Sequence, residues 1–200
     1  MFSKCKGLMV FALLGIIQFS AEASVAVVPG AAPVALPGTT AFAEGDLGGT
    51  VESDTLIPFR IMSAAGALLF QGTLQDRVVR SSTTGTLHFY YRIRNTTSGL
   101  NGIIRSVQSR SFEFAPVTFV DWRPDGLGSV NPVVASRSPA AGPVITFGFN
   151  PAVNPLVGGM ESRFFFVKTE AKNFNQMGQT RIILRTGESV LLKTMQPTRW

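Results

Sequence analysis

Apolar and polar residues alternate along much of this chain with the period of two that is typical of β-strands. In segment 87–94 the residues at odd positions are all apolar or aromatic and would share one face. The residues of the opposite face are His88, Tyr90, Arg92 and Arg94. A half-buried strand of an antiparallel sheet has this pattern. We therefore expect the odd-numbered face to lie in the core and the even-numbered face to contact solvent.

Similar segments, rich in Val, Ile, Phe and Thr and bounded by turn-forming residues, predict further strands. They span 67–73, 103–114, 118–121, 144–149, 163–169, 181–185 and 189–195. Segment 164–167 is apolar on both faces, which predicts a central strand covered on both sides. Helical periodicity is rare, and 169–176 is expected to hold a helical turn at most. The sequence predicts an all-β fold, an antiparallel β-sandwich or a jelly-roll-like domain.

The N-terminal 23 residues have the features of a secretory signal peptide. Lys4 and Lys6 precede an apolar run over 8–17, and Ala21-Glu22-Ala23 matches a signal-peptidase site. The alternative, a membrane anchor, needs about 20 consecutive apolar residues, which this run does not reach. We expect cleavage between Ala23 and Ser24, a secreted or periplasmic protein, and no transmembrane segment in the mature chain. The single Cys5 would leave with the signal.

The mature chain is predicted to have two parts. Segment 24–43 is rich in Val, Ala, Pro and Gly and has no charged residue. Its prolines fix φ and lack an N–H donor, which predicts an extended or disordered arm. Residues 44–200 would form one β-sandwich domain, long enough to bury a normal core.

Composition and charge narrow the classes of function. The chain is 45% hydrophobic and 15% charged, and its net charge is +6. Removal of Lys4, Lys6 and Glu22 with the signal leaves +5, carried mostly by arginines scattered from Arg60 to Arg199. Nucleic-acid binding would require a basic stripe or patch, so no nucleic-acid partner is expected. Acidic polysaccharide is the more suitable anion for dispersed arginines in an exported protein.

Catalytic and metal-binding patterns are weak. His88 is the sole histidine and lies mid-strand without a nucleophile elbow, so it is interpreted as an exposed polar residue. The Asp121–Gly126 segment resembles a surface turn more than a calcium loop, because the other ligands of such a loop are missing. We expect no enzyme activity, cofactor or metal. A two-carboxylate glycosidase stays as an alternative, with Glu113 and either Glu161 or Glu170 as the pair.

The even-numbered face of segment 87–94 is the candidate ligand face. Aromatic and arginine side chains together suit sugar rings and uronates. The alternative function is a carbohydrate-binding module for acidic or neutral polysaccharide, with Tyr90, Trp122 and Trp200 as candidate stacking platforms. An ordinary solvated sheet face with cross-strand pairs is the competing interpretation.

Several motifs are similar to the bodies of bacterial exported PEP-CTERM-type proteins of unknown function. The similarity covers roughly 46–197. Its motifs are Gly48-Gly49-Thr50-Val51, Ile57-Pro58-Phe59, Leu69-Phe70-Gln71-Gly72, Arg77-Val78-Val79-Arg80, Thr84 to Arg92, Ala135-Ser136-Arg137-Ser138, Val144-Ile145-Thr146-Phe147, Gly158 to Phe166 and Lys168-Thr169-Glu170-Ala171. The resemblance implies an exported structural body and brings no catalytic residues.

One departure from that family concerns sorting. Its members continue into Pro-Glu-Pro, an apolar helix and a basic tail, whereas this sequence ends in Met195-Gln196-Pro197-Thr198-Arg199-Trp200. The expectation is secretion or periplasmic retention without that anchor. The first hypothesis for function is a non-enzymatic structural or adhesive protein of the envelope or extracellular matrix. Polysaccharide or another envelope protein would be its partner, and the sequence does not indicate an oligomeric state.

Overall fold

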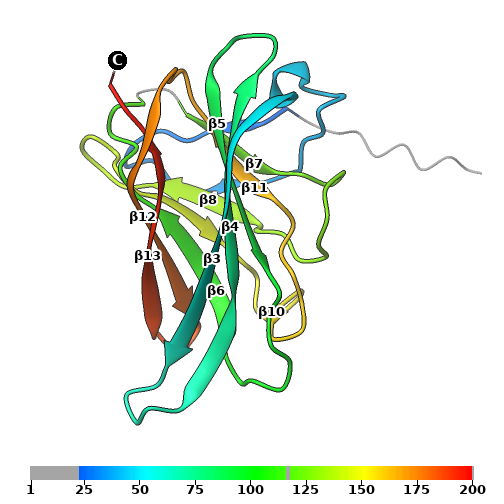
Figure 1. The fold of residues 1–200 in the computed structure, drawn as a ribbon, viewed down its shortest axis with the longest axis vertical. Coiled ribbons are helices and arrows are strands. Elements are labelled where there is room, and N and C mark those ends of the chain that lie inside the picture. The colour runs from blue at the N-terminus through cyan, green and yellow to red at the C-terminus, as the bar shows by residue number, and fades with distance from the viewer. Residues whose placement is uncertain (1–22, 116–117, 200) are drawn as a thin grey trace, which may run out of the picture.

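The computed structural model describes residues 23–115 and 118–199. Cys5, Trp200 and all of the predicted signal peptide except Ala23 lie outside the described residues. The described chain has 13 strands, a single 3-10 turn at Gly45–Leu47 and no α-helix. The strands form two antiparallel sheets, so the prediction of an antiparallel all-β fold is confirmed (Figure 1).

Sheet A has six strands, and their spatial order is not their order in the sequence. The order is β1 (Val25–Ala26), β7 (Phe119–Trp122), β11 (Phe165–Lys168), β5 (Leu87–Arg94), β4 (Leu68–Ser81) and β3 (Gly49–Met62).

Sheet B has seven strands. Six follow the order β13 (Ser189–Pro197), β12 (Phe174–Leu184), β6 (Ile103–Ser109), β9 (Ile145–Gly148), β8 (Val134–Arg137) and β2 (Val34–Ala35). The seventh, β10 (Leu156–Val157), also pairs with β6.

The core lies between the two sheets, as expected for a sandwich. Alternate residues of β4 point inward, so this strand contributes the fully buried Leu74 and Val78. Strand β6 contributes the fully buried Ile104 and Val107, which lie on either side of a register shift in its pairing with β12. Across the interface, the ring of Phe147 on β9 lies 4.8 Å from that of Phe165 on β11. Large aromatic rings fill the space between the sheets. Burial of this apolar surface is the main driving force for folding.

The prediction of a central strand at 164–167 is confirmed by β11. This strand lies between β7 and β5, and it is covered on both faces. Phe165 and Val167 point into the core, whereas Phe166 packs on the outer face with Tyr90. An apolar run without alternation is what such a position requires.

Several elements differ from the sequence analysis, among them β8, for which no strand was expected. Residues 49–62, for which no strand was expected, form β3 at the edge of sheet A. Pro58 is tolerated there because an edge strand has one side without ladder bonds. Residues from Phe174 onward belong to β12, where a helical turn was expected. Figure 1 shows the β3–β4 hairpin projecting along the long axis, with the β12–β13 hairpin beside it.

Segment 24–43 runs along both sheets. Its strand β1 pairs with β7 at one edge of sheet A, and its strand β2 pairs with β8 at one edge of sheet B. Val27 and Leu36 are buried in the core. The carboxylate of Asp121 holds the segment by accepting hydrogen bonds from the Gly38 N–H at 2.9 Å and the Thr39 hydroxyl at 2.5 Å.

Candidate ligand-binding site

A pocket of about 500 Å³ lies on the outer face of sheet A, away from the core. Because side chains alternate along a strand, Gln75, Arg77 and Val79 of β4 point outward while their neighbours fill the core. Tyr90, Arg92 and Arg94 of β5 point to the same side. This volume lies within the range of small-molecule and sugar sites.

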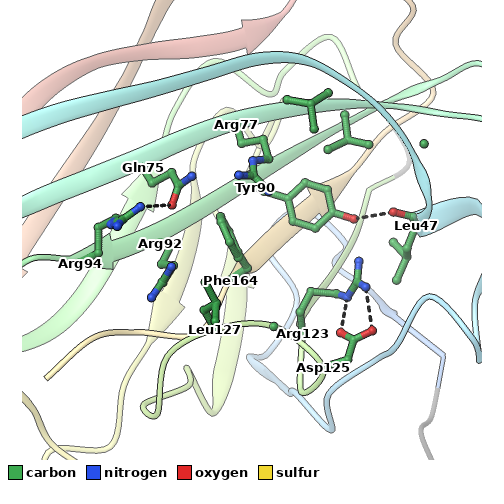
Figure 2. Close-up of a pocket in the computed structure, with 14 residues that line it drawn as sticks. Leu47, Gln75, Arg77, Tyr90, Arg92, Arg94, Arg123, Asp125, Leu127 and Phe164 are labelled. Atoms are coloured by element: carbon green, nitrogen blue, oxygen red, sulfur yellow. Dashed lines mark hydrogen bonds and ion pairs between the residues drawn. The ribbon is translucent and has the colours of Figure 1, made fainter.

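The walls of the pocket come from distant parts of the chain. Leu47 of the 3-10 turn lies at one end, the loop from Arg123 to Leu127 at another side, and Phe164 near the centre (Figure 2). These segments cover the outer face of β5.

The predicted ligand face is therefore buried where it was expected to be exposed. His88 is completely buried, and Tyr90 and Arg92 are each 4% exposed. Only Arg94 is partly accessible. The expectation that this face is solvated was wrong because covering segments cannot be recognised from the alternation within one strand. Three of the four residues do line one pocket, as a ligand face requires.

His88 does not line this pocket. It lies at the start of β5, paired with Lys168 of β11. Neither ring nitrogen has a hydrogen-bond partner among the described residues, and burial lowers the pKa of His88 to about 4. The imidazole is therefore neutral, and the interpretation of His88 as an exposed residue is corrected.

The aromatic part of the pocket is built by Phe164 and Tyr90, whose rings meet edge to face at 6.3 Å. The Tyr90 hydroxyl donates to the Leu47 carbonyl at 3.2 Å, and burial raises the pKa of Tyr90 to about 12. Tyr90 is thus fixed and largely covered. Phe164 is partly exposed, and the guanidinium groups of Arg77 and Arg92 lie 4.9 and 5.7 Å from its ring centre.

Three of the four arginines that line the pocket have carboxylate partners. Arg77 pairs with Asp54 at 2.6 Å, and Arg123 pairs with Asp125 through two bonds of 2.8 Å. Arg92 pairs with Glu161. Partial burial raises the pKa of Asp54, but the bonds from Arg77 and Gln75 outweigh it and hold this pKa below its ordinary value.

Arg94 differs from the other three. Among the described residues it has no carboxylate within ion-pair distance, and its one side-chain bond is a long 3.5 Å contact with the Gln75 amide oxygen. Its Nε is buried and has no partner. Figure 2 shows Arg94 and Gln75 at the end of the pocket opposite Leu47. The pocket therefore contains a guanidinium whose hydrogen-bonding capacity is largely unused.

Of the other two candidate platforms, Trp200 lies outside the described residues, and Trp122 is engaged by other groups. The Trp122 indole donates to the Leu36 carbonyl at 3.2 Å, and the Arg163 guanidinium lies 5.4 Å from its ring. Gly38 packs so closely, with φ of 95°, that a Cβ would lie 2.6 Å from the ring. Segment 24–43 thus covers part of this tryptophan, which stays partly exposed.

The predicted carboxylate pairs are not assembled in the pocket on the outer face of sheet A. The carboxylate among its lining residues is that of Asp125. Glu161 accepts from Arg92 and the Asn95 N–H near the end of β5. Glu170 lies at the opposite end, where it lines a smaller pocket of about 280 Å³ with Asp46. Asp46 is ion-paired with Lys168.

Asp121, considered for a metal turn, is buried and accepts hydrogen bonds from the protein itself. Its partners are the Gly38 and Trp122 N–H groups and the Thr39 hydroxyl. Over the described ranges, no three His, Cys, Asp or Glu side chains gather in a way that would hold a metal ion. No helix in this part of the chain is long and apolar enough to cross a bilayer.

Sequence reasoning missed most of the pocket, since it identified only Tyr90, Arg92 and Arg94 among the lining residues. Gln75 and Arg77 lie beyond the predicted end of their strand at 73, although they alternate with inward-facing Leu74 and Val78. Phe164 was predicted to belong to a central strand, but not to face a pocket. Comparison with protein-family models finds no match, and comparisons with curated proteins and with solved structures find none either.

Proposed function

We propose that this chain is an exported, non-enzymatic β-sandwich protein that binds acidic polysaccharide in the pocket on the outer face of sheet A. The observation that carries the proposal is Arg94, a pocket-lining guanidinium without a carboxylate partner among the described residues. A guanidinium presents two parallel N–H donors that match the two oxygens of a carboxylate. A uronate is the sugar that supplies such a group.

The remaining lining supports a charged sugar better than a neutral one. Four arginines line the pocket, and three of them are neutralised by Asp54, Glu161 and Asp125, so among the described residues Arg94 leaves one positive charge in excess. Phe164 offers a partly exposed aromatic ring beside Arg77 and Arg92. Neutral polysaccharide would depend more on open aromatic platforms, whereas Tyr90 is 4% exposed and Trp122 is partly buried, with its indole N–H bonded to the Leu36 carbonyl.

The predicted signal peptide supports the cellular context of this proposal. Cleavage near Ala23–Ser24 would deliver the protein to the periplasm or the medium, where it meets envelope and matrix polysaccharides rather than nucleic acid. Binding without turnover would give it a structural or adhesive role, as the resemblance to exported PEP-CTERM-type bodies implies.

Retention on immobilised polysaccharides tests the proposal. We expect the protein to be retained on polygalacturonate and to pass through neutral dextran. Retention should weaken as salt rises, because exposed charges are screened. No new reducing ends should appear after long incubation. Equal passage through both columns would contradict the binding proposal, and release of reducing ends would contradict the non-enzymatic part.

A further inference from the structure

Ser24, the first residue after the predicted cleavage site, is held firmly by the domain. Its backbone N–H donates to Glu44 Oε2 at 2.9 Å, and its hydroxyl donates to Oε1 of the same carboxylate at 2.9 Å. Ser24 is 9% exposed, whereas the preceding Ala23 is exposed. Among the described residues, burial therefore begins at Ser24, where processing is predicted to leave a new N-terminus.

Glu44 belongs to a cluster with more negative than positive charge. Lys168 Nζ contacts both Glu44 and Asp46, at 2.9 Å from Asp46 Oδ2. The side chains of Glu44, Asp46 and Lys168 are 15%, 17% and 19% exposed. The second oxygen of Asp46 is buried and has no hydrogen-bond partner.

No other cation completes this cluster among the described side chains. His88 is adjacent but completely buried and neutral, so it adds no positive charge. Two carboxylates thus share one ammonium. An uncompensated charge away from water is costly unless it is paired.

We propose that Ser24 is the N-terminus of the mature protein and that its α-ammonium group is the second cation of this cluster. An ammonium supplies three N–H donors where the amide supplies one. One donor is already directed at Glu44 Oε2, and the positive charge of the ammonium would balance the second carboxylate of the cluster. The proposal rests on the predicted cleavage between Ala23 and Ser24 and is independent of the polysaccharide pocket.

This arrangement couples processing to folding. In the precursor the Ser24 nitrogen is an uncharged amide, and the cluster keeps its excess negative charge. Cleavage converts that nitrogen into a cation at the same position. Charged hydrogen bonds are stronger than neutral ones, so the mature domain should be more stable than the same domain carrying an N-terminal extension.

The test begins with mass spectrometry of the exported protein, whose chain should start at Ser24. Three forms are then compared by urea unfolding: the free amine, the N-acetylated protein and a form that retains Ala23. The unfolding equilibrium constant should be about tenfold larger for the acetylated and extended forms. Glu44→Gln should abolish this difference, whereas Ser24→Ala, which removes only the hydroxyl bond, should preserve it.

A second measurement uses the unsubstituted protein, so it does not depend on whether the variants fold. The α-amino pKa, measured from the pH dependence of its labelling rate, should lie above the ordinary value of about 8 because the ion pair favours the charged form. A mature N-terminus elsewhere in the chain would overturn the proposal. Equal stability of the three forms, an acetylation effect that survives Glu44→Gln, or an α-amino pKa at its ordinary value would also overturn it.

Discussion

The carboxylate of Asp76, on β4 of sheet A, accepts a 2.7 Å hydrogen bond from the backbone N–H of Met195, on β13 of sheet B. This contact joins the two sheets inside the sandwich. Asp76 is completely buried, and its other oxygen has no partner. Burial raises the pKa of Asp76 to about 7, although the Met195 bond opposes the shift.

Asp76 should make stability fall as pH rises from about 4 to about 7. Over that interval the folded protein keeps a proton that the unfolded chain has lost, so the folded state is favoured at the acidic end. Three pKa units correspond to about 4 kcal/mol. Asp76→Asn should match the wild type near pH 4 and exceed it above pH 7, as measured by urea unfolding across this range.

Asp54→Asn is the matched control for this substitution. Asp54 lies on the outer side of sheet A, and its pKa is lowered rather than raised. Its replacement should therefore give no gain in stability at pH 7 and above. A difference between wild type and Asp76→Asn that does not change with pH would contradict the assignment.

His88 should make stability depend on pH in the opposite direction, so that stability rises with pH. The folded pKa of about 4 lies below the ordinary value of 6.5, so the unfolded chain binds a proton first as pH falls. Stability contributed by neutral His88 is present above about pH 6.5 and lost toward pH 4, by about 3 kcal/mol. Glu44, Asp46 and Lys168 are the charged groups around this ring.

His88→Leu should remove that loss. Both ring nitrogens are unpartnered, so an apolar side chain leaves no hydrogen bond broken. The variant should gain stability relative to wild type as pH falls from 7 to 4. If the free energies of unfolding of the two proteins change by the same amount between pH 7 and pH 4, His88 is not held neutral.

Asp121 should be important for stability rather than for ligand binding. It accepts hydrogen bonds from Gly38, Thr39 and Trp122, and its loss leaves these buried donors unsatisfied. We expect Asp121→Ala to lower the free energy of unfolding by about 3 kcal/mol and to increase proteolysis within 24–43. Asp125→Ala, which removes an exposed ion pair with Arg123, should cost less than about 1 kcal/mol. Equal effects of the two substitutions would contradict this role.

The sequence predicts strands well where alternation or an apolar run is local. The observed bounds of β5 match the predicted ones. The central position of β11 could be predicted because segment 164–167 is apolar on both faces. The edge strand β3 was missed because its residues are mostly exposed and include Pro58. Edge strands carry a weak pattern, since packing constrains only part of their length.

The pocket could be predicted only in part. Tyr90, Arg92 and Arg94 were identified because they share one face of one strand. Their burial depends on Leu47, the loop after β7 and Phe164, which are remote in sequence and meet only in the folded chain. The ion pair of Arg77 with Asp54 likewise depends on the register of β3 on β4. No periodicity within a single segment encodes either relationship.

The most direct test of polysaccharide binding is a calorimetric titration with oligogalacturonate. Wild-type protein should bind, and Arg94→Gln should weaken binding at least about tenfold, since a charged hydrogen bond is worth about 1.5–3 kcal/mol. Arg105→Gln, an equivalent change at an exposed position on β6 of sheet B, should leave the affinity unchanged. Equal affinities for wild type and Arg94→Gln, or no binding by wild type, would contradict the account.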